Sequence, residues 1–201
     1  MFKNKLTITF VLMIGFCFHT YAQSIYEEAR NEYLYGDLKK AIVLFSTSIK
    51  NGEQIAKSYM YRGVAKSFLN DFTGAKSDLN ASEEIDSDDF ELYYYYGKYH
   101  YLKGEYNLSL NCFDKSIVLN KDFADSYDAR ALSRFLLEDY EGSIADENKA
   151  IQLNPKKYIY YTNRGNIFLQ LNMYDEAINN FNHSIKIKPT SKAYTLSLIH
   201  I

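Results

Sequence analysis

The sequence predicts an all-α solenoid, an α-α superhelix built from five helical hairpins of 34 residues each. Two observations carry this prediction. The chain repeats itself with a strict period of 34 residues, and the repeated positions alternate between small and large side chains, as two packed helices require. With 201 residues, 47% of them hydrophobic and 24% charged, the chain has the composition of a folded protein with a substantial core.

The segment before the repeats has the three-part layout of a secretory signal peptide. Lys3 and Lys5 form a basic start, residues 6–18 are apolar, and Thr20 and Ala22 place small residues before a cleavage site. The apolar stretch is shorter than the roughly 20 residues of a membrane span. We therefore predict a signal peptide at 1–22 and an exported chain, periplasmic or secreted, with no membrane span after cleavage. The alternative is an uncleaved N-terminal anchor.

Five repeats follow over residues 23–189. Their approximate bounds are 22–55, 56–89, 90–123, 124–157 and 158–189. An aromatic residue or leucine opens the second half of each repeat and recurs without insertion or deletion. This column contains Leu38, Phe72, Tyr106, Tyr140 and Tyr174. Two columns of small residues keep the same step. They contain Ala29, Gly63, Gly97, Ala131 and Gly165, and Ala41, Ala75, Ser109, Ser143 and Ala177.

Each repeat is predicted to form two antiparallel helices joined by a short turn. In the third repeat these helices cover about 90–103 and 106–119, with Gly104 between them because glycine favours a helix end. Gly97 and Ser109 let the two helices approach closely, and large side chains fill the volume beside that contact. The same reasoning applies to the other four repeats.

These columns resemble the tetratricopeptide repeat (TPR), a 34-residue unit of two helices with aromatic, small and proline positions at these offsets. The resemblance covers residues 23–189. The chain departs from the family pattern at Glu147, which stands where Phe45, Phe113 and Phe181 stand in other repeats. Because a buried carboxylate needs a partner or water, we expect Glu147 to be partly exposed or paired. We also expect the packing around it to be the weakest of the five repeats.

Oppositely charged residues recur at a spacing that places them on the facing helices of one hairpin. Arg62 and Asp78 are 16 residues apart, and Arg130 and Asp146 repeat that relation. Arg164 has Asn180 at the same offset. We predict that the two Arg–Asp sets form ion pairs that hold their hairpins together and have no catalytic role.

The repeats contain no recognisable catalytic or metal motif. His100 and His183 are far apart in sequence, and neither has a metal-binding partner at a helical offset. The acidic run at 83–89 lacks the glycine and the spaced glutamate of a calcium loop. We predict no catalytic residue, no cofactor and no metal, and therefore no enzyme. A net charge of −2 gives no reason to expect nucleic-acid binding.

The TPR resemblance implies a protein-binding groove lined by the first helix of each hairpin. The positions that map to it are Tyr26, Arg30, Tyr33, Met60, Val64, Ser67, Tyr94, Lys98, Tyr101, Asp128, Leu132, Phe135, Thr162, Asn166 and Leu169. The resemblance thus implies an exported scaffold that binds a protein or peptide on its concave surface. An enzyme in its own right is the alternative from another class. The lysine and asparagine pairs with which some family members hold chaperone carboxylates are absent from these positions.

The C-terminal end favours a further alternative. A sixth repeat is predicted to start within residues 190–201, and residues 196–201 read like the translation of a sequencing adapter. Our hypothesis is that these six residues are an artefact and that the native chain continues. The repeats would then be the N-terminal module of a longer protein, such as a sensor, a transport accessory or an enzyme.

Overall fold

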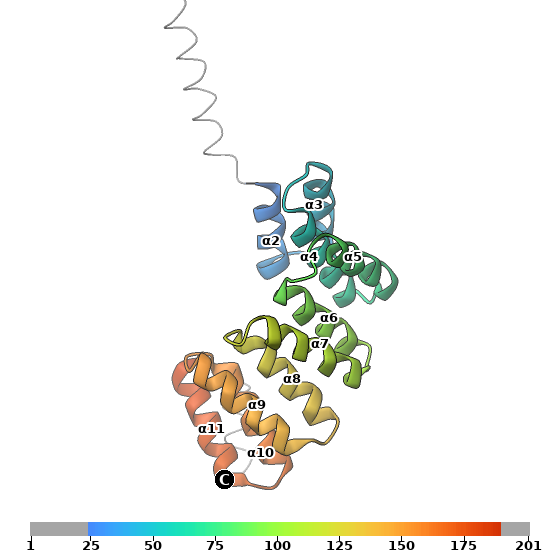
Figure 1. Ribbon diagram of the computed structural model, residues 1–201. Coiled ribbons are helices and arrows are strands. Elements are labelled where there is room, and N and C mark those ends of the chain that lie inside the picture. Colours follow the sequence, from blue (N-terminus) through green and yellow to red (C-terminus); the bar gives the residue numbers. More distant parts are fainter. Residues whose placement is uncertain (1–23, 190–201) are drawn as a thin grey trace, which may run out of the picture. The chain divides into compact units, whose positions relative to one another are not determined.

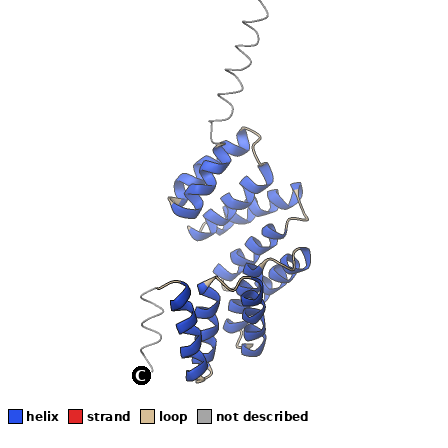
Figure 2. Cartoon of the chain, turned by 90° about the vertical axis from the view of Figure 1, so that its left-hand side faces the viewer, coloured by secondary structure: helices blue, strands red, loops and turns tan. Residues whose placement is uncertain are grey.

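The computed structural model describes residues 24–189, and every regular element among them is an α-helix (Figures 1 and 2). The helices are α2 (Ile25–Tyr35), α3 (Leu38–Lys50), α4 (Ile55–Phe68), α5 (Phe72–Ile85), α6 (Phe90–Leu102), α7 (Tyr106–Leu119), α8 (Ala124–Leu136), α9 (Tyr140–Leu153), α10 (Tyr158–Gln170) and α11 (Tyr174–Ile187). They form five consecutive hairpins, which confirms the all-α solenoid of helix-turn-helix repeats. The predicted signal peptide and sixth repeat lie outside the described residues.

The chain divides after Ile85 into two compact units. The N-terminal unit contains α2 to α5, and the C-terminal unit contains α6 to α11. Within each unit every helix packs against the next one along the chain, so each hairpin is covered by its neighbours. This nearest-neighbour packing is the property that makes repeat proteins nearly one-dimensional in their energetics.

Aromatic rings fill the centre of the N-terminal unit. Phe45 of α3 stacks on Tyr61 of α4, with ring centroids 5.8 Å apart. Tyr26 and Tyr33 of α2 contact the same tyrosine ring at centroid distances of 6.4 and 5.3 Å. Tilted and offset ring pairs at these distances contribute beyond the area they bury. A single tyrosine on α4 therefore joins all three helices.

The small-residue column has a steric cause in the C-terminal unit. A Cβ atom added at Gly97 would lie 2.3 Å from the Phe113 ring, and one added at Gly165 would lie 2.5 Å from Phe181. Both phenylalanines are almost completely buried. Glycine on the first helix therefore makes room for the ring that the second helix presents.

The turn inside the hairpin repeats with the same period as the sequence. Asn70, Gly104, Glu138 and Asn172 are 34 residues apart, and all four have a positive φ, between 59° and 75°. Glycine and asparagine tolerate this left-handed conformation, whereas glutamate does so at a cost of roughly 1 kcal/mol. Glu138 is thus the strained member of the series.

Both predicted ion pairs are confirmed. The Arg62 Nε and Nη2 atoms donate to the two carboxylate oxygens of Asp78, at 2.8 and 2.6 Å. Arg130 donates to Asp146 in the same way, at 2.9 and 2.6 Å. Arg164 donates from Nε to Oδ1 of Asn180 at 2.8 Å, as its spacing implies. The two-pronged geometry of the Arg–Asp pairs fixes orientation as well as distance.

Each of these arginines also reaches back to the preceding hairpin, which the sequence analysis missed. The Nη1 atom of Arg62 donates to Ser46 at 2.9 Å, that of Arg130 to Asp114 at 2.6 Å, and that of Arg164 to Asn148 at 2.5 Å. The offset is again 16 residues, now toward the N-terminus. One guanidinium thereby joins three consecutive helices.

The expectation for Glu147 was wrong. Its side chain on α9 is completely buried, and neither carboxylate oxygen has a hydrogen-bond partner among the described residues. The hairpin register directs its Cβ into the interior, as it does for Phe113 and Phe181, and the glutamate side chain is too short to reach solvent. Burial, followed by the charge of nearby Asp128, raises the pKa of Glu147 well above its ordinary range.

Candidate functional site

The structure buries much of the predicted groove in the N-terminal unit. Tyr26, Met60 and Val64 are 9%, 0% and 2% exposed, and Ser67 is buried as well. Arg30 is exposed, and its guanidinium lies 3.8 Å from the Glu27 carboxylate. Tyr33 is half-buried against Tyr61. Few of the predicted side chains in this unit therefore present a surface to a partner.

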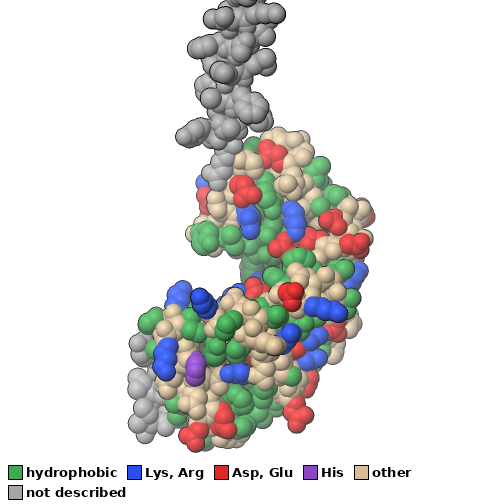
Figure 3. Space-filling view, turned by 60° about the vertical axis from the view of Figure 1, so that its left-hand side comes forward, with side chains coloured by type: hydrophobic (Ala, Val, Ile, Leu, Met, Phe, Trp, Pro, Cys, Tyr) green, Lys and Arg blue, Asp and Glu red, His purple; other side chains and the backbone are tan. Residues whose placement is uncertain are grey.

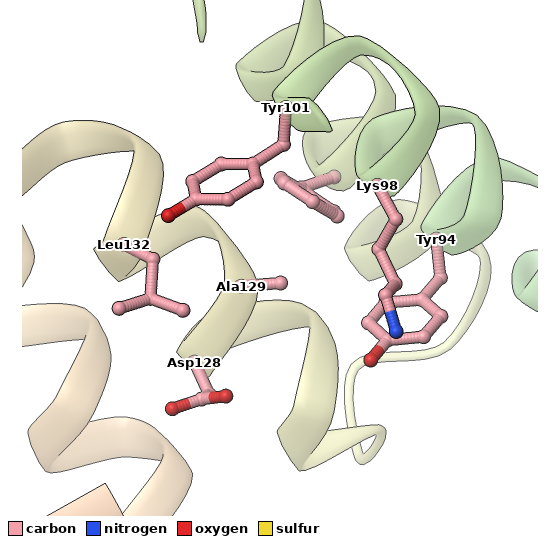
Figure 4. A pocket seen from close by; sticks show the side chains of 7 residues that line it. Tyr94, Lys98, Tyr101, Asp128, Ala129 and Leu132 are labelled. Atoms are coloured by element: carbon pink, nitrogen blue, oxygen red, sulfur yellow. The ribbon is translucent and has the colours of Figure 1, made fainter. Parts of the chain in front are cut away.

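In the C-terminal unit a pocket of about 180 Å³ brings together five of the predicted residues (Figure 4). They are Tyr94, Lys98, Tyr101, Asp128 and Leu132. Phe113 and Ala129 also line the pocket and were not predicted, because they lie outside the first-helix positions that the resemblance supplies. A pocket lined by aromatic and apolar groups with one cation and one carboxyl group is typical of a recognition site.

The remaining predicted residues of this unit lie outside the pocket. Phe135 packs against Tyr140 with ring centroids 5.7 Å apart. Thr162 is buried and shares a 2.7 Å hydrogen bond with Ser184. Asn166 and Leu169 are half-buried on α10.

Helical periodicity explains why the pocket residues converge. Tyr94, Lys98 and Tyr101 are spaced by four and three residues, so α6 presents them on one face. Asp128 and Leu132 occupy the corresponding positions of α8, one repeat later. The first helices of adjacent hairpins thus provide two walls, and Figure 4 shows their side chains facing the same space.

Aromatic rings and the Lys98 ammonium form one side of the pocket. The Tyr94 ring lies 6.1 Å from that of Phe113 and 5.2 Å from that of Phe123, the latter in an edge-on contact. The Lys98 Nζ atom lies 5.4 Å from the Tyr94 ring centroid and 5.8 Å from that of Tyr95. Burial lowers the pKa of Lys98, because removal from water disfavours the charged ammonium.

Carboxyl groups form the other side. Oδ1 of Asp128 accepts a 2.7 Å hydrogen bond from the Asn163 amide of α10, a partner that no spacing rule had indicated. Burial raises the pKa of Asp128 to about 6, and the hydrogen bond from Asn163 offsets part of that effect. Glu147 adjoins Asp128 from α9. Two carboxyl groups and one neutral amide therefore meet behind the pocket.

Other functional features are few in the part of the chain that the structure describes. No group of three or more His, Cys, Asp or Glu side chains within 24–189 is arranged to hold a metal ion. Within the same residues no helix is both long and apolar enough to cross a bilayer. On the face drawn in Figure 3, basic and acidic side chains alternate among hydrophobic ones. The aromatic pocket of α6 to α8 is therefore the strongest candidate site.

Comparison with known proteins agrees with the repeat architecture. The family described as tetratricopeptide repeat matches residues 158–191, which include the hairpin of α10 and α11. The protein STIP1 homolog of Dictyostelium discoideum is 31% identical over 88 residues, which make up 44% of this chain and 16% of that protein. The chain thus spans a small part of the length of this curated relative.

Two solved structures share the fold. TTC0263, a thermophilic TPR protein of Thermus thermophilus, superposes with a TM-score of 0.79 at 15% identity, covering 88% of this chain and 99% of that one. YrrB, described as a TPR protein with an unusual peptide-binding site, superposes with a TM-score of 0.60 at 13% identity, covering 85% and 88%. Together with the family match, these likenesses support the tetratricopeptide-repeat family.

Proposed function

We propose that this protein is an exported, non-enzymatic scaffold that binds a protein partner as a peptide segment along the first helices of its hairpins. The pocket between α6 and α8 carries the proposal. It gathers residues from two repeats into one cavity of about 180 Å³. A stacked repeat array generates an extended surface of this kind without any further element.

The chemistry of the pocket favours a peptide over a small substrate. Tyr94, Tyr101 and Phe113 offer large, stiff aromatic surfaces of the type that anchors protein interfaces. Lys98 and Asp128 add one group of each charge, which can fix the direction and register of a bound chain. YrrB, which shares the fold, is described as having a peptide-binding site.

Export is the second part of the proposal and rests on residues 1–22 alone. The basic start, the apolar run and the small residues before position 23 support it. Expression in the native host, followed by N-terminal sequencing of the protein from the extracytoplasmic fraction, tests it. We expect a mature chain that begins near Gln23. Recovery of a chain that retains Met1 from the cytoplasm would contradict export.

Peptide binding is tested by selecting from a random peptide display library with the purified full chain. The selected peptides are then measured against Tyr94→Ala/Tyr101→Ala. The matched control is Tyr35→Ala/Tyr174→Ala, which removes two exposed tyrosines outside the pocket. We expect the pocket variant to lose binding and the control to keep it. Equal binding by wild type and both variants would refute the pocket as the site.

A further inference from the structure

The acid groups behind the pocket differ from the other buried acids of the chain. Asp78 and Asp146 each accept two arginine hydrogen bonds, and each also lies within 2.9 Å of a second cation, Lys66 or Arg134. Asp125 is paired with Lys157 at 2.5 Å. A buried or half-buried carboxylate in this protein is thus normally neutralised by a cation from a neighbouring helix.

Asp128 and Glu147 break this rule. The hydrogen-bond donor to Asp128 is the neutral amide of Asn163. Glu147 is completely buried, and neither of its oxygens has a hydrogen-bond partner in the described part of the chain. Two adjacent acids without a cation of the kind found elsewhere leave a local excess of acidic groups, which costs stability unless something compensates it.

The pocket opens onto this uncompensated pair. Asp128 is one of its lining residues, and Figure 4 shows the carboxyl group below Ala129, with Leu132 and Tyr101 above it. The Lys98 nitrogen lies apart from this part of the pocket, beside the Tyr94 ring. A flat cation that entered between Tyr101 and Asp128 would meet an aromatic surface on one side and carboxylate oxygens on the other.

We infer that the pocket receives an arginine side chain of the bound peptide, with its guanidinium against Tyr101 and paired with Asp128. This inference rests on the proposed function. A guanidinium is planar, stacks on aromatic faces and pairs with a carboxylate through two parallel hydrogen bonds. Those features match the aromatic and acidic walls of the pocket better than an ammonium or an apolar side chain does.

Proton uptake opposes this binding. The pKa of Asp128 is raised to about 6, so its carboxyl group gains a proton as the pH falls below that value. The charged groups that influence Asp128 or Glu147 are Asp125 on α8, Asp146 on α9, Lys98 on α6, and Lys157 and Arg164 at α10. An arginine needs the ionised form of Asp128, so its affinity falls between pH 7.5 and pH 5.

The test measures binding of short host peptides to the full chain by NMR titration. Four peptides of identical Gly-Ser-Ala sequence carry Arg, Lys, Glu or Leu at one central position. We expect the Arg peptide to shift the amide signals of residues 94–101 and 128–132, and to bind about tenfold more tightly than the Glu or Leu peptide. We also expect its affinity to fall severalfold between pH 7.5 and pH 5.

Two variants sharpen the test. Asp128→Asn removes the charge at constant size and should abolish the preference for Arg. Lys98→Met removes the competing cation and should strengthen Arg binding severalfold, which cannot result from misfolding. Tighter binding of the Glu peptide, weakened by Lys98→Met, would overturn the arginine inference and leave a peptide-binding pocket in place. Absence of any shift at the pocket with all four peptides would contradict both the inference and the proposed function.

Discussion

Hairpins α6–α7 and α8–α9 share one 34-residue frame and fill it with opposite chemistry. In the first, Phe113 occupies the interior position and Tyr96 and Cys112 occupy the cross-hairpin positions. In the second, Glu147 occupies the interior and Arg130 and Asp146 form the cross-hairpin pair. Helix geometry is the same in both. The difference shows that register decides which side chain is buried, whereas its chemistry decides what the burial costs.

The two polar substitutions in α8–α9 act in opposite directions. Arg130 and Asp146 satisfy each other through two hydrogen bonds, so their burial is compensated. Glu147 lies one residue further along α9 and has no such partner among the described residues. The predictions below separate a compensated charge from an uncompensated one, in order of decreasing expected effect.

The largest expected effect comes from breaking the compensated pair. Asp146→Ala leaves Arg130 without its two-pronged partner and should lower the free energy of unfolding by about 3 kcal/mol. Cys112→Ala changes the corresponding position of α7 and should cost no more than about 1 kcal/mol. Urea unfolding followed by circular dichroism gives both values. Equal losses would mean that the Arg130–Asp146 pair adds nothing to its hairpin.

Removal of the uncompensated carboxyl group should stabilise the protein. Glu147→Leu replaces it with the residue type of Leu79, which occupies the same position beside Gly63 in the second repeat. We expect a gain of about 2 kcal/mol in the free energy of unfolding. Phe113→Leu is the matched control and should lose about 1 kcal/mol by leaving a gap. Destabilisation by Glu147→Leu would show that the glutamate has a stabilising partner.

The acid pair should make the protein more stable as the pH falls toward 5. The raised pKa values of Asp128 and Glu147 mean that the folded state holds protons which the unfolded state has lost. Their contribution is therefore present below the unfolded pKa of about 4 and is lost as the pH rises through the folded value. Relative to Asp128→Asn/Glu147→Leu, wild type should gain about 1–2 kcal/mol between pH 7.5 and pH 5. A parallel pH dependence of the two proteins would contradict this.

The smallest effect concerns the turns that the two hairpins share. Glu138 and Gly104 occupy equivalent positions with φ values of +62° and +75°. Glu138→Gly should stabilise the protein by roughly 0.5–1 kcal/mol, and Gly104→Ala should destabilise it by a similar amount. Thermal melts of the two variants check the signs. Loss of stability with Glu138→Gly would mean that the glutamate side chain supports its turn.

The fold could be predicted because its causes are local and repeated. The 34-residue period fixed helix positions closely, so that the third repeat was expected at 90–103 and 106–119 and forms helices Phe90–Leu102 and Tyr106–Leu119. The Arg–Asp pairs were predictable for the same reason, since two positions 16 residues apart face each other in every hairpin.

Contacts that need a neighbouring hairpin escaped prediction. The backward hydrogen bond from Arg130 to Asp114 and the Asn163 amide on Asp128 depend on how hairpins stack, which spacing within one repeat does not specify. The burial of Met60 was missed because a first-helix position can face either a partner or the protein itself. Glu147 was misjudged because its polarity was weighed more heavily than its register.

The measurement that tests the account most directly is a ¹³C-detected titration of the side-chain carboxyl groups in the intact protein. The account predicts that Asp128 titrates near pH 6 and that Glu147 titrates well above the ordinary range of a glutamate. It also predicts that an arginine peptide moves the Asp128 midpoint downward, because a bound guanidinium favours the ionised carboxylate. Midpoints near 4 for both groups, unmoved by the peptide, would contradict the buried acid pair and the role given to it.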